Sequence, residues 1–157
     1  MNGPGDWDLP SPHVLALAVA DADIDAYDHV NNAVYVTWCD RAAWDHSAAL
    51  GLPIERCLAL DRGMAVIRST IVYLRPALRG DAVQVATWLL PSERRLRIGR
   101  RFQVRRPADG ATLVRAAIEY ACLELSSGRP ARWPAEFRAR YVCPPEVLRA
   151  LAALPAL

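Results

Sequence analysis

The chain has 157 residues and a formal net charge of only +2, a length that fits one domain with its own core and a charge too small to indicate nucleic-acid binding. Its four cysteines stand far apart, with no C-x-x-C pair and no histidine at zinc-ligand spacing, which argues against a disulfide framework or a metal knuckle. No stretch has the pattern of a secretory signal or a membrane-spanning helix, so we expect a cytoplasmic protein that needs no metal or cofactor and binds neither nucleic acid nor membrane.

The N-terminal part divides into a leader, a strand and an acidic loop. Residues 1–12 are rich in glycine and proline and predict a flexible leader. An apolar run over residues 13–20 predicts the first strand. The acidic loop that follows contains Asp21, Asp23, Asp25 and Asp28.

A long helix is predicted from about Asn32 to Leu50, where Gly51-Leu52-Pro53 stops it. Its first half, residues 33–39, is apolar on nearly every side, which is typical of a helix enclosed by the rest of the domain. Asn31 and Asn32 are both cap residue types, so one of them is expected to cap the helix start.

The rest of the chain changes to the alternation and turn residues of β-strands. Turn residues between the strands favour consecutive antiparallel hairpins. The fold class expected is α+β, an antiparallel β-sheet wrapped around one long central α-helix. We expect a domain over residues 13–140 and a C-terminal helical tail over 141–157, in which Val147, Leu151 and Leu154 share the side that docks onto the domain or a partner subunit. The predicted strands cover residues 64–74, 82–90, 96–104 and 113–125.

The acidic loop and the helix start together have the composition of an active site. A helix N-terminus offers unpaired backbone N–H groups and a partial positive charge, which suit a developing oxyanion. Asp25 and His29 bring a carboxylate and an imidazole within reach of it. The aspartate spacing also matches the opening of a calcium loop, but Ala26 and Asn32 stand where such a loop needs glycine and glutamate, so no metal is expected.

The same loop carries the sequence pattern Asp-x-Asp-x-x-x-His-Val-Asn-Asn-x-x-Tyr, and later segments agree with it. This pattern resembles that of hotdog-fold acyl thioesterases of the 4-hydroxybenzoyl-CoA thioesterase-like family. The resemblance implies a hotdog protomer that forms homodimers, often homotetramers, with acyl-CoA or acyl-carrier-protein thioesters bound at the subunit interface. The matching residues are Asp23, Asp25, His29, Val30, Asn31, Asn32 and Tyr35, then Ile71 to Ala77, Gly80, Asp81, Trp88 and Gly128 to Pro130.

The resemblance also implies roles for individual positions. Asp25 matches the catalytic carboxylate, as nucleophile or general base, and the backbone N–H of Asn32 falls where the thioester carbonyl is polarised. His29 has either a direct chemical role or the role of tying the loop by hydrogen bonds. Asp28 stands where the family usually has glycine or glutamine, and it adds a negative charge to the site.

Substrate contacts are expected from the helix and from an arginine-rich strand. Asn31 would shape the site as a cap, while Tyr35 and Trp38 would pack in the core and, second, contact the acyl group. The third predicted strand alternates between an apolar face and a face of arginines that we expect to be solvated. If that face binds a ligand instead, Arg97 and Arg101 suit the phosphates of coenzyme A or of a carrier-protein phosphopantetheine. The arginine cluster comprises Arg94, Arg95, Arg97, Arg100, Arg101, Arg105 and Arg106.

Other functions stay open at this point. A hotdog hydratase or dehydratase would need an Asp-x-Asn-Pro-x-His run, which the sequence lacks. A non-catalytic acyl-thioester binding module would bind its ligand tightly without turnover. RNA could also bind an arginine-rich face, but no RNA-binding motif accompanies it.

Overall fold

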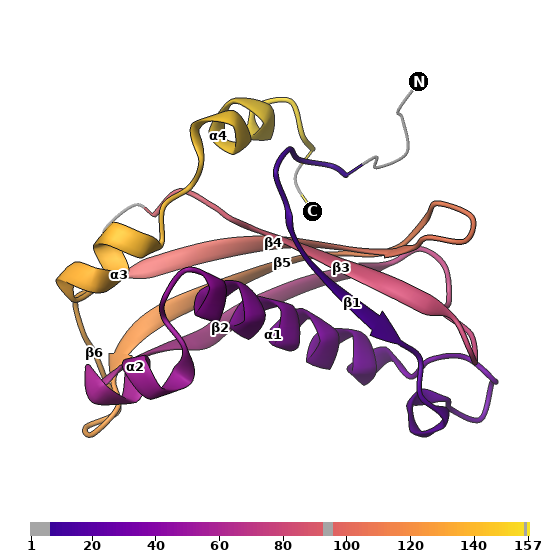
Figure 1. The fold of residues 1–157 in the computed structure, drawn as a ribbon, viewed down its shortest axis with the longest axis horizontal. Coiled ribbons are helices and arrows are strands. Elements are labelled where there is room, and N and C mark those ends of the chain that lie inside the picture. Colours follow the sequence, from indigo (N-terminus) through magenta and orange to yellow (C-terminus); the bar gives the residue numbers. More distant parts are fainter. Residues whose placement is uncertain (1–6, 93–95, 156) are drawn as a thin grey trace.

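The computed structural model describes residues 7–92, 96–155 and 157, which form a curved antiparallel sheet with one long helix on its concave side (Figure 1). The predicted sheet wrapped around a central helix is confirmed, and each predicted strand lies within two residues of its predicted bounds. No helix in this described part of the chain is both long and apolar enough to cross a lipid bilayer. In chain order the elements are β1 (His13–Ala18), the 3-10 turn η1 (Asp21–Asp23), α1 (Asn32–Ala49), α2 (Ile54–Ala59), β2 (Arg62–Tyr73), β3 (Ala82–Leu89), β4 (Arg97–Arg106), β5 (Ala111–Glu124), β6 (Arg129–Pro130), α3 (Ala135–Arg140) and α4 (Pro145–Leu151).

The strands follow the order β1-β3-β4-β5-β2 across the sheet, and β6 pairs with the end of β5. The hairpins predicted between β3, β4 and β5 are confirmed. The hairpin predicted between β2 and β3 is wrong, because β1 takes the place beside β3, with His13 opposite Thr87, and β2 pairs with β5 instead. β2 therefore lies at an edge of the sheet, and no described strand pairs with its outer side.

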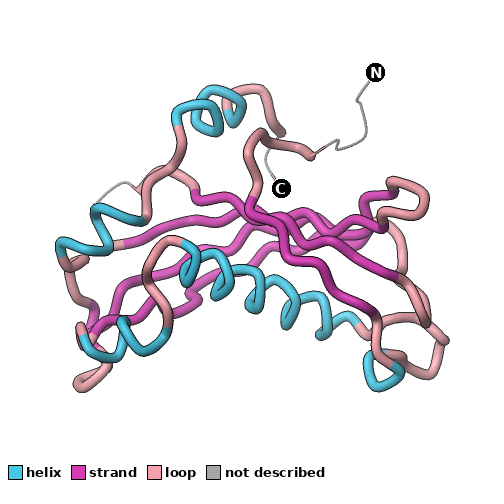
Figure 2. Tube along the Cα trace, viewed as in Figure 1, coloured by secondary structure: helices cyan, strands magenta, loops and turns pink. Residues whose placement is uncertain are grey.

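Helix α1 begins at the predicted residue. Asn31 is the N-cap, and its side-chain oxygen accepts a hydrogen bond from the backbone N–H of Ala33 at 2.9 Å. The predicted enclosure on nearly every side is wrong, since Val36 and Trp44 are 40% and 39% exposed. The sheet of one chain covers only one side of the helix (Figure 2), so these apolar side chains face outward. The buried face consists of Tyr35, Trp38, Cys39, Ala42, Ala43 and Ser47.

A second, smaller core lies on the convex face of the sheet, under the N-terminal segment and α4 (Figure 1). Of residues 7–12, which belong to the predicted flexible leader, Trp7 and Leu9 pack into this core; residues 1–6 lie outside the described residues. The three tail side chains predicted to share one side all belong to this core, on the domain itself. It comprises Leu9, Ala86, Trp88 and Val147, with Trp7, Cys143, Ala150, Leu151 and Leu154 packed against them.

The arginine-bearing face of β4 is covered by the same segments, so its predicted exposure is wrong over much of the strand. The guanidinium of Arg105 lies over the ring of Trp7, 5.0 Å from its centroid. Arg101 donates a hydrogen bond to the backbone oxygen of Pro155 at 2.9 Å. Residues 94–95 of the predicted arginine cluster lie outside the described residues.

The core on the concave side of the sheet contains a buried arginine. Arg100 alternates in step with Ile98 and Phe102, so its side chain points toward α1, and the residue is only 4% exposed. Its guanidinium donates to Nδ1 of His46 at 2.9 Å and to Oγ of Ser47 at 3.1 Å. Burial, reinforced by the charge of Arg100, lowers the pKa of His46 to about 3, so this imidazole is neutral at physiological pH.

The loop before α1 contains one residue with a left-handed backbone. Asp28 has a φ of 59°, a conformation that glycine adopts without steric cost and that aspartate and asparagine adopt more readily than most other residues. Its side chain is exposed. The glycine that the sequence resemblance leads one to expect at this position therefore has a conformational reason.

Replacing Asp28 tests this conformation. Asp28→Gly should be more stable than Asp28→Ala by about 1 kcal/mol in the free energy of unfolding, because only alanine brings a Cβ into the left-handed region. Urea denaturation of both variants measures the difference. Equal stabilities, or a more stable alanine variant, would contradict the backbone geometry.

The lowered pKa of His46 makes stability depend on pH. The unfolded chain takes up a proton near the ordinary pKa of 6.5 and the folded chain only near 3, so the folded state loses stability as the pH falls through that interval. The loss from this residue is at most about 1.4 kcal/mol per pH unit. His46→Asn, which keeps an acceptor for Arg100, should show a smaller decline in unfolding free energy between pH 6.5 and 4. A decline as steep as that of the wild type would refute the assignment to His46.

Candidate active site

The acidic loop folds tightly against the start of α1. Asp23 closes the 3-10 turn by accepting a hydrogen bond from the backbone N–H of Ala20 at 2.8 Å, and its own carbonyl accepts from the N–H of Asn31 at 2.8 Å. Ile24 and Val30 form an isolated antiparallel bridge across the loop. The loop therefore has a defined backbone that is fixed to the helix cap.

Asp25 is half-buried in this loop and is one of the residues that line a cleft at the helix start. One carboxylate oxygen accepts a hydrogen bond from the backbone N–H of Tyr27 at 2.8 Å, which orients the side chain. The backbone N–H of Asp25 donates to the carbonyl of His29 at 2.8 Å. Among the described residues no cation lies within ion-pair distance of the Asp25 carboxylate, so its charge is not neutralised by the chain.

The cleft has a volume of about 310 Å³ and brings together the three residues predicted to be catalytic. Asp28, whose negative charge was expected to add to the site, is not among the residues that line the cleft. Asp23 is also absent from the lining, and its carboxylate is hydrogen-bonded within the 3-10 turn. The lining consists of Asp25, Tyr27, His29, Val30, Asn32, Tyr35, Tyr73, Leu74, Arg75 and Pro76.

The first backbone N–H of α1, that of Asn32, has no hydrogen-bond acceptor within the part of the chain that the structure describes. Asn31 satisfies the N–H of Ala33 through its side chain and that of Val34 through its carbonyl, at 2.9 and 3.0 Å. Among the described residues, nothing accepts a hydrogen bond from the backbone N–H of Asn32. This donor lies at the positive end of the helix dipole and beside the cleft, which is the arrangement needed to bind an oxygen that gains negative charge.

Tyr35 connects the helix to the opposite wall of the cleft. Its hydroxyl oxygen accepts a hydrogen bond from the backbone N–H of Ala77 at 2.7 Å, and burial raises its pKa, so it stays protonated. Its ring packs edge-on against that of Tyr73, whose hydroxyl donates to the carbonyl of Asn32 at 3.1 Å. Trp38, predicted to pack in the core and, second, to contact the acyl group, is buried in the core and is not among the residues that line the cleft.

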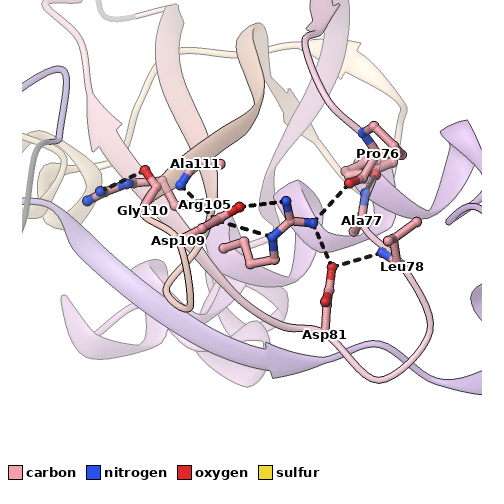
Figure 3. A network of polar contacts seen from close by, with 10 residues as sticks. Pro76, Ala77, Leu78, Asp81, Arg105, Asp109, Gly110 and Ala111 are labelled. Atoms are coloured by element: carbon pink, nitrogen blue, oxygen red, sulfur yellow. Dashed lines mark hydrogen bonds and ion pairs between the residues drawn. The ribbon is translucent and has the colours of Figure 1, made fainter.

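A polar network behind the cleft holds segment 76–78 in place (Figure 3). Arg106 donates to the carboxylate of Asp81 at 3.0 Å, to that of Asp109 at 2.8 Å and to the carbonyl of Pro76 at 3.3 Å. Asp81 in turn accepts from the backbone N–H of Leu78 at 2.9 Å. The segment then binds the acidic loop, since the carbonyl of Ala77 accepts from the N–H of Val30 at 3.0 Å.

The arginines predicted to contact substrate do not reach the cleft of this chain. Arg97 lines a separate surface depression together with Glu119, and Arg101 is bound to the C-terminal segment. The cation that does line the cleft is Arg75, which sequence reasoning did not single out. The described residues contain no group of three or more histidine, cysteine, aspartate or glutamate side chains arranged to hold a metal ion.

Comparisons with known proteins identify the family of this chain. Residues 19–141 match the sequence profile of the thioesterase-like superfamily. An acyl-acyl carrier protein thioesterase from Arabidopsis thaliana, ATL2, is 26% identical over 118 residues, which cover 75% of this chain and 53% of the relative. The chain thus spans about half the length of the curated relative it matches.

Solved structures share the fold. The 1,4-dihydroxy-2-naphthoyl-CoA thioesterase Slr0204 from Synechocystis superposes with a TM-score of 0.75 at 17% identity, covering 83% of this chain and 96% of that one. The hypothetical protein TT1821 from Thermus thermophilus gives 0.73 at 25% identity, covering 91% and 99%. The fold is therefore a hotdog fold, and on its matching profile this chain belongs to the thioesterase-like superfamily.

Proposed function

We propose that this protein hydrolyses acyl thioesters, with the thioester carbonyl bound at the start of α1. One observation supports this most strongly: Asp25, which carries a carboxylate, lines the same cleft as Asn32, whose backbone N–H has no acceptor among the described residues. The first supplies a nucleophile or base and the second an oxyanion donor, which are the two groups that attack on a thioester requires.

The chemistry needs few other groups. A thiol has a pKa of about 8.5, so the thiolate leaves without a strong general acid. In one route an Asp25 oxygen attacks the carbonyl carbon, the C–S bond breaks, and water then hydrolyses the acyl–aspartyl anhydride. In the other route Asp25 takes a proton from the water that attacks. Both routes place charge on the carbonyl oxygen, and losing one donor to such an oxygen typically slows a reaction by about 10²–10³.

The other lining residues have subsidiary roles in this proposal. His29 is exposed at the cleft, and its backbone pairs with Leu78 as well as with Asp25, so it ties the loop whether or not its ring meets the substrate. Arg75 offers a planar cation at the cleft for the phosphates of coenzyme A or a carrier-protein phosphopantetheine. Relatives named for each kind of thioester are known, so the proposal covers both.

The cleft is proposed to become complete in a homodimer. Tyr73 and Leu74, at the end of the edge strand β2, form part of its wall and are 44% and 46% exposed. Val66 and Ile67 on the same strand, and Trp44 on the outer face of α1, are exposed as well. Antiparallel pairing of β2 with its copy about a two-fold axis would cover these apolar groups and extend the sheet. The convex face is already covered by α4, so a tetramer would have to form through another surface.

The activity test compares two carboxylates of one loop. Asp25→Asn should lower kcat/KM for acyl-CoA thioesters by about 10² or more, since general base or nucleophilic catalysis is lost while the size of the side chain is kept. Asp28→Asn, which makes the same change on a side chain outside the cleft, should stay within about threefold of the wild type. Free thiol release over a panel of acyl-CoAs is the measurement. Full activity of Asp25→Asn, or no thiol release by the wild type from any panel member, would refute the proposal.

The dimer test places like charges at the proposed two-fold axis. Ile67→Glu should convert a particle of twice 17.3 kDa into a monomer and lower thioesterase activity by about tenfold or more, because two glutamates would face one another across paired strands. Light scattering after size exclusion gives the mass. Leu148→Glu, on the exposed side of α4, is the matched control and should remain dimeric. A monomeric wild type with full activity would contradict the shared site.

A further inference from the structure

A small cavity lies at the opposite end of α1 from the cleft, between the helix and the sheet. Its volume is about 60 Å³, which holds a group of a few atoms, since one water needs about 10–15 Å³. Arg100, Tyr120 and Ser47 form its inner wall, and the exposed side chains of Val66 and Trp44 stand at its mouth. Ala43, Cys57, Met64 and Ile98 also line it, and Asp40 lies at its exposed side. The cavity therefore combines the polar groups around Arg100 with an otherwise largely apolar wall.

The guanidinium of Arg100 forms no ion pair with any carboxylate of the described residues. It donates only to His46 Nδ1 and Ser47 Oγ, two of its five N–H groups, and the ring of Tyr141 lies 5.9 Å away. Among the described residues none of the carboxylates forms an ion pair with it, and Asp40, the acidic residue of the lining, stays at the exposed side. A buried charge without a counter-charge is costly, so a site of this kind favours an anion.

The neighbours of Arg100 are arranged to remain neutral. A guanidinium can only donate, so His46 must accept through Nδ1 and carry its own proton on Nε2. Ser47 Oγ also accepts from the hydroxyl of Tyr141 at 3.0 Å. The chain therefore supplies neutral acceptors around the cation and leaves three of its N–H groups without a partner among the described residues. A carboxylate can accept two of these in parallel, a geometry that arginine recognises well.

The proposed dimer brings this cavity to the thioester cleft of the other subunit. Within one chain, the Tyr73 end of β2 lies at the helix start, and the Met64 end lies at the cavity. Antiparallel pairing of β2 with its copy reverses the second strand, so the Tyr73 end of one copy lies beside the Met64 end of the other. The acyl group of a thioester held in one cleft can then extend past the apolar mouth toward Arg100 of the partner subunit.

On this basis, which rests on the function proposed above, we propose that Arg100 binds a carboxylate at the far end of the acyl group, so that the preferred substrates are thioesters of dicarboxylic acids. The apolar mouth would contact the methylene or ring portion of the acyl group. Ser47 and the Tyr120 hydroxyl lie within the same lining and would complete the polar end. A neutral acyl terminus would leave the charge of Arg100 without a partner.

The test compares pairs of acyl-CoA thioesters of equal length, with and without a terminal carboxylate. At the best length the wild type should show a kcat/KM at least about tenfold higher for the carboxylated member, the effect of one strong charged hydrogen-bonded contact. Arg100→Met should lose this ratio and keep turnover of the uncarboxylated members. Arg149→Met, an exposed arginine on α4, should behave as the wild type.

A second measurement needs no variant, in case Arg100→Met does not fold. Free dicarboxylic acids should inhibit the wild type competitively at concentrations at least about tenfold lower than monocarboxylic acids of equal length. Hydrolysis of uncarboxylated thioesters without any preference for carboxylated ones, or a preference that survives Arg100→Met, would overturn the assignment of Arg100 and leave the thioesterase function intact. If the wild type hydrolyses no thioester, the proposed function fails, and the carboxylate site is then tested by thermal unfolding. A larger rise in Tm with dicarboxylic than with monocarboxylic acids would support the site at Arg100, and equal rises would refute it.

Discussion

The hydrogen-bonding pattern at the first turn of α1 is the feature on which the site depends. The Asn31 side chain accepts a hydrogen bond from the N–H of Ala33, and the Asn31 carbonyl accepts one from the N–H of Val34. No described residue accepts a hydrogen bond from the N–H of Asn32, a residue that lines the cleft. A cap that satisfied every donor would remove the anion-binding character of the helix end. In the proposed mechanism the loop before the helix needs only one carboxylate beside this donor, and Asp25 is the residue proposed to supply it.

The position of that carboxylate is fixed by residues far away in the sequence. Val30 is bonded to Ala77, Ala77 to Tyr35, and the adjoining carbonyl of Pro76 to Arg106, so the loop, the helix and the end of β4 form one connected network. Arg106 is held between Asp81 and Asp109, which restricts its own movement (Figure 3). Catalytic groups are effective only when such supporting contacts hold them in a narrow range of positions.

Local sequence patterns were sufficient to predict the helix and the strand positions, and the loop pattern with its family resemblance placed Asp25, His29 and Asn32 together at one site. The helix start follows from cap residue types at Asn31 and Asn32, and the strands follow from alternation. Pairing of β2 with β5 could not be predicted, because turn residues do not show that β1 occupies the place beside β3. The packed segment 7–12 was missed for a similar reason, since glycine and proline describe local flexibility and not a distant apolar partner.

The arginines show most clearly that local patterns do not reveal which distant segments cover a residue. The alternation of β4 assigned Arg97 and Arg101 to one face, and the structure keeps that parity. Composition favoured a solvated face, with a ligand site as the alternative, but the terminal segments pack there. Arg100 has the opposite parity, and the strand period was the available signal that it points inward. Arg75 lines the cleft because of the path of the chain after β2, which no local pattern encodes.

In the proposed function the start of α1 polarises a thioester carbonyl beside Asp25. Infrared spectroscopy measures the stretching frequency of this C=O bond directly. A thioester labelled with carbon-13 at its carbonyl, bound to the inactive Asp25→Asn variant, should show its carbonyl stretch at a lower frequency than in water, because a preorganised donor at a helix N-terminus weakens the C=O bond more than solvent does. A bound thioester whose carbonyl stretch stays at or above the frequency in water would contradict the account.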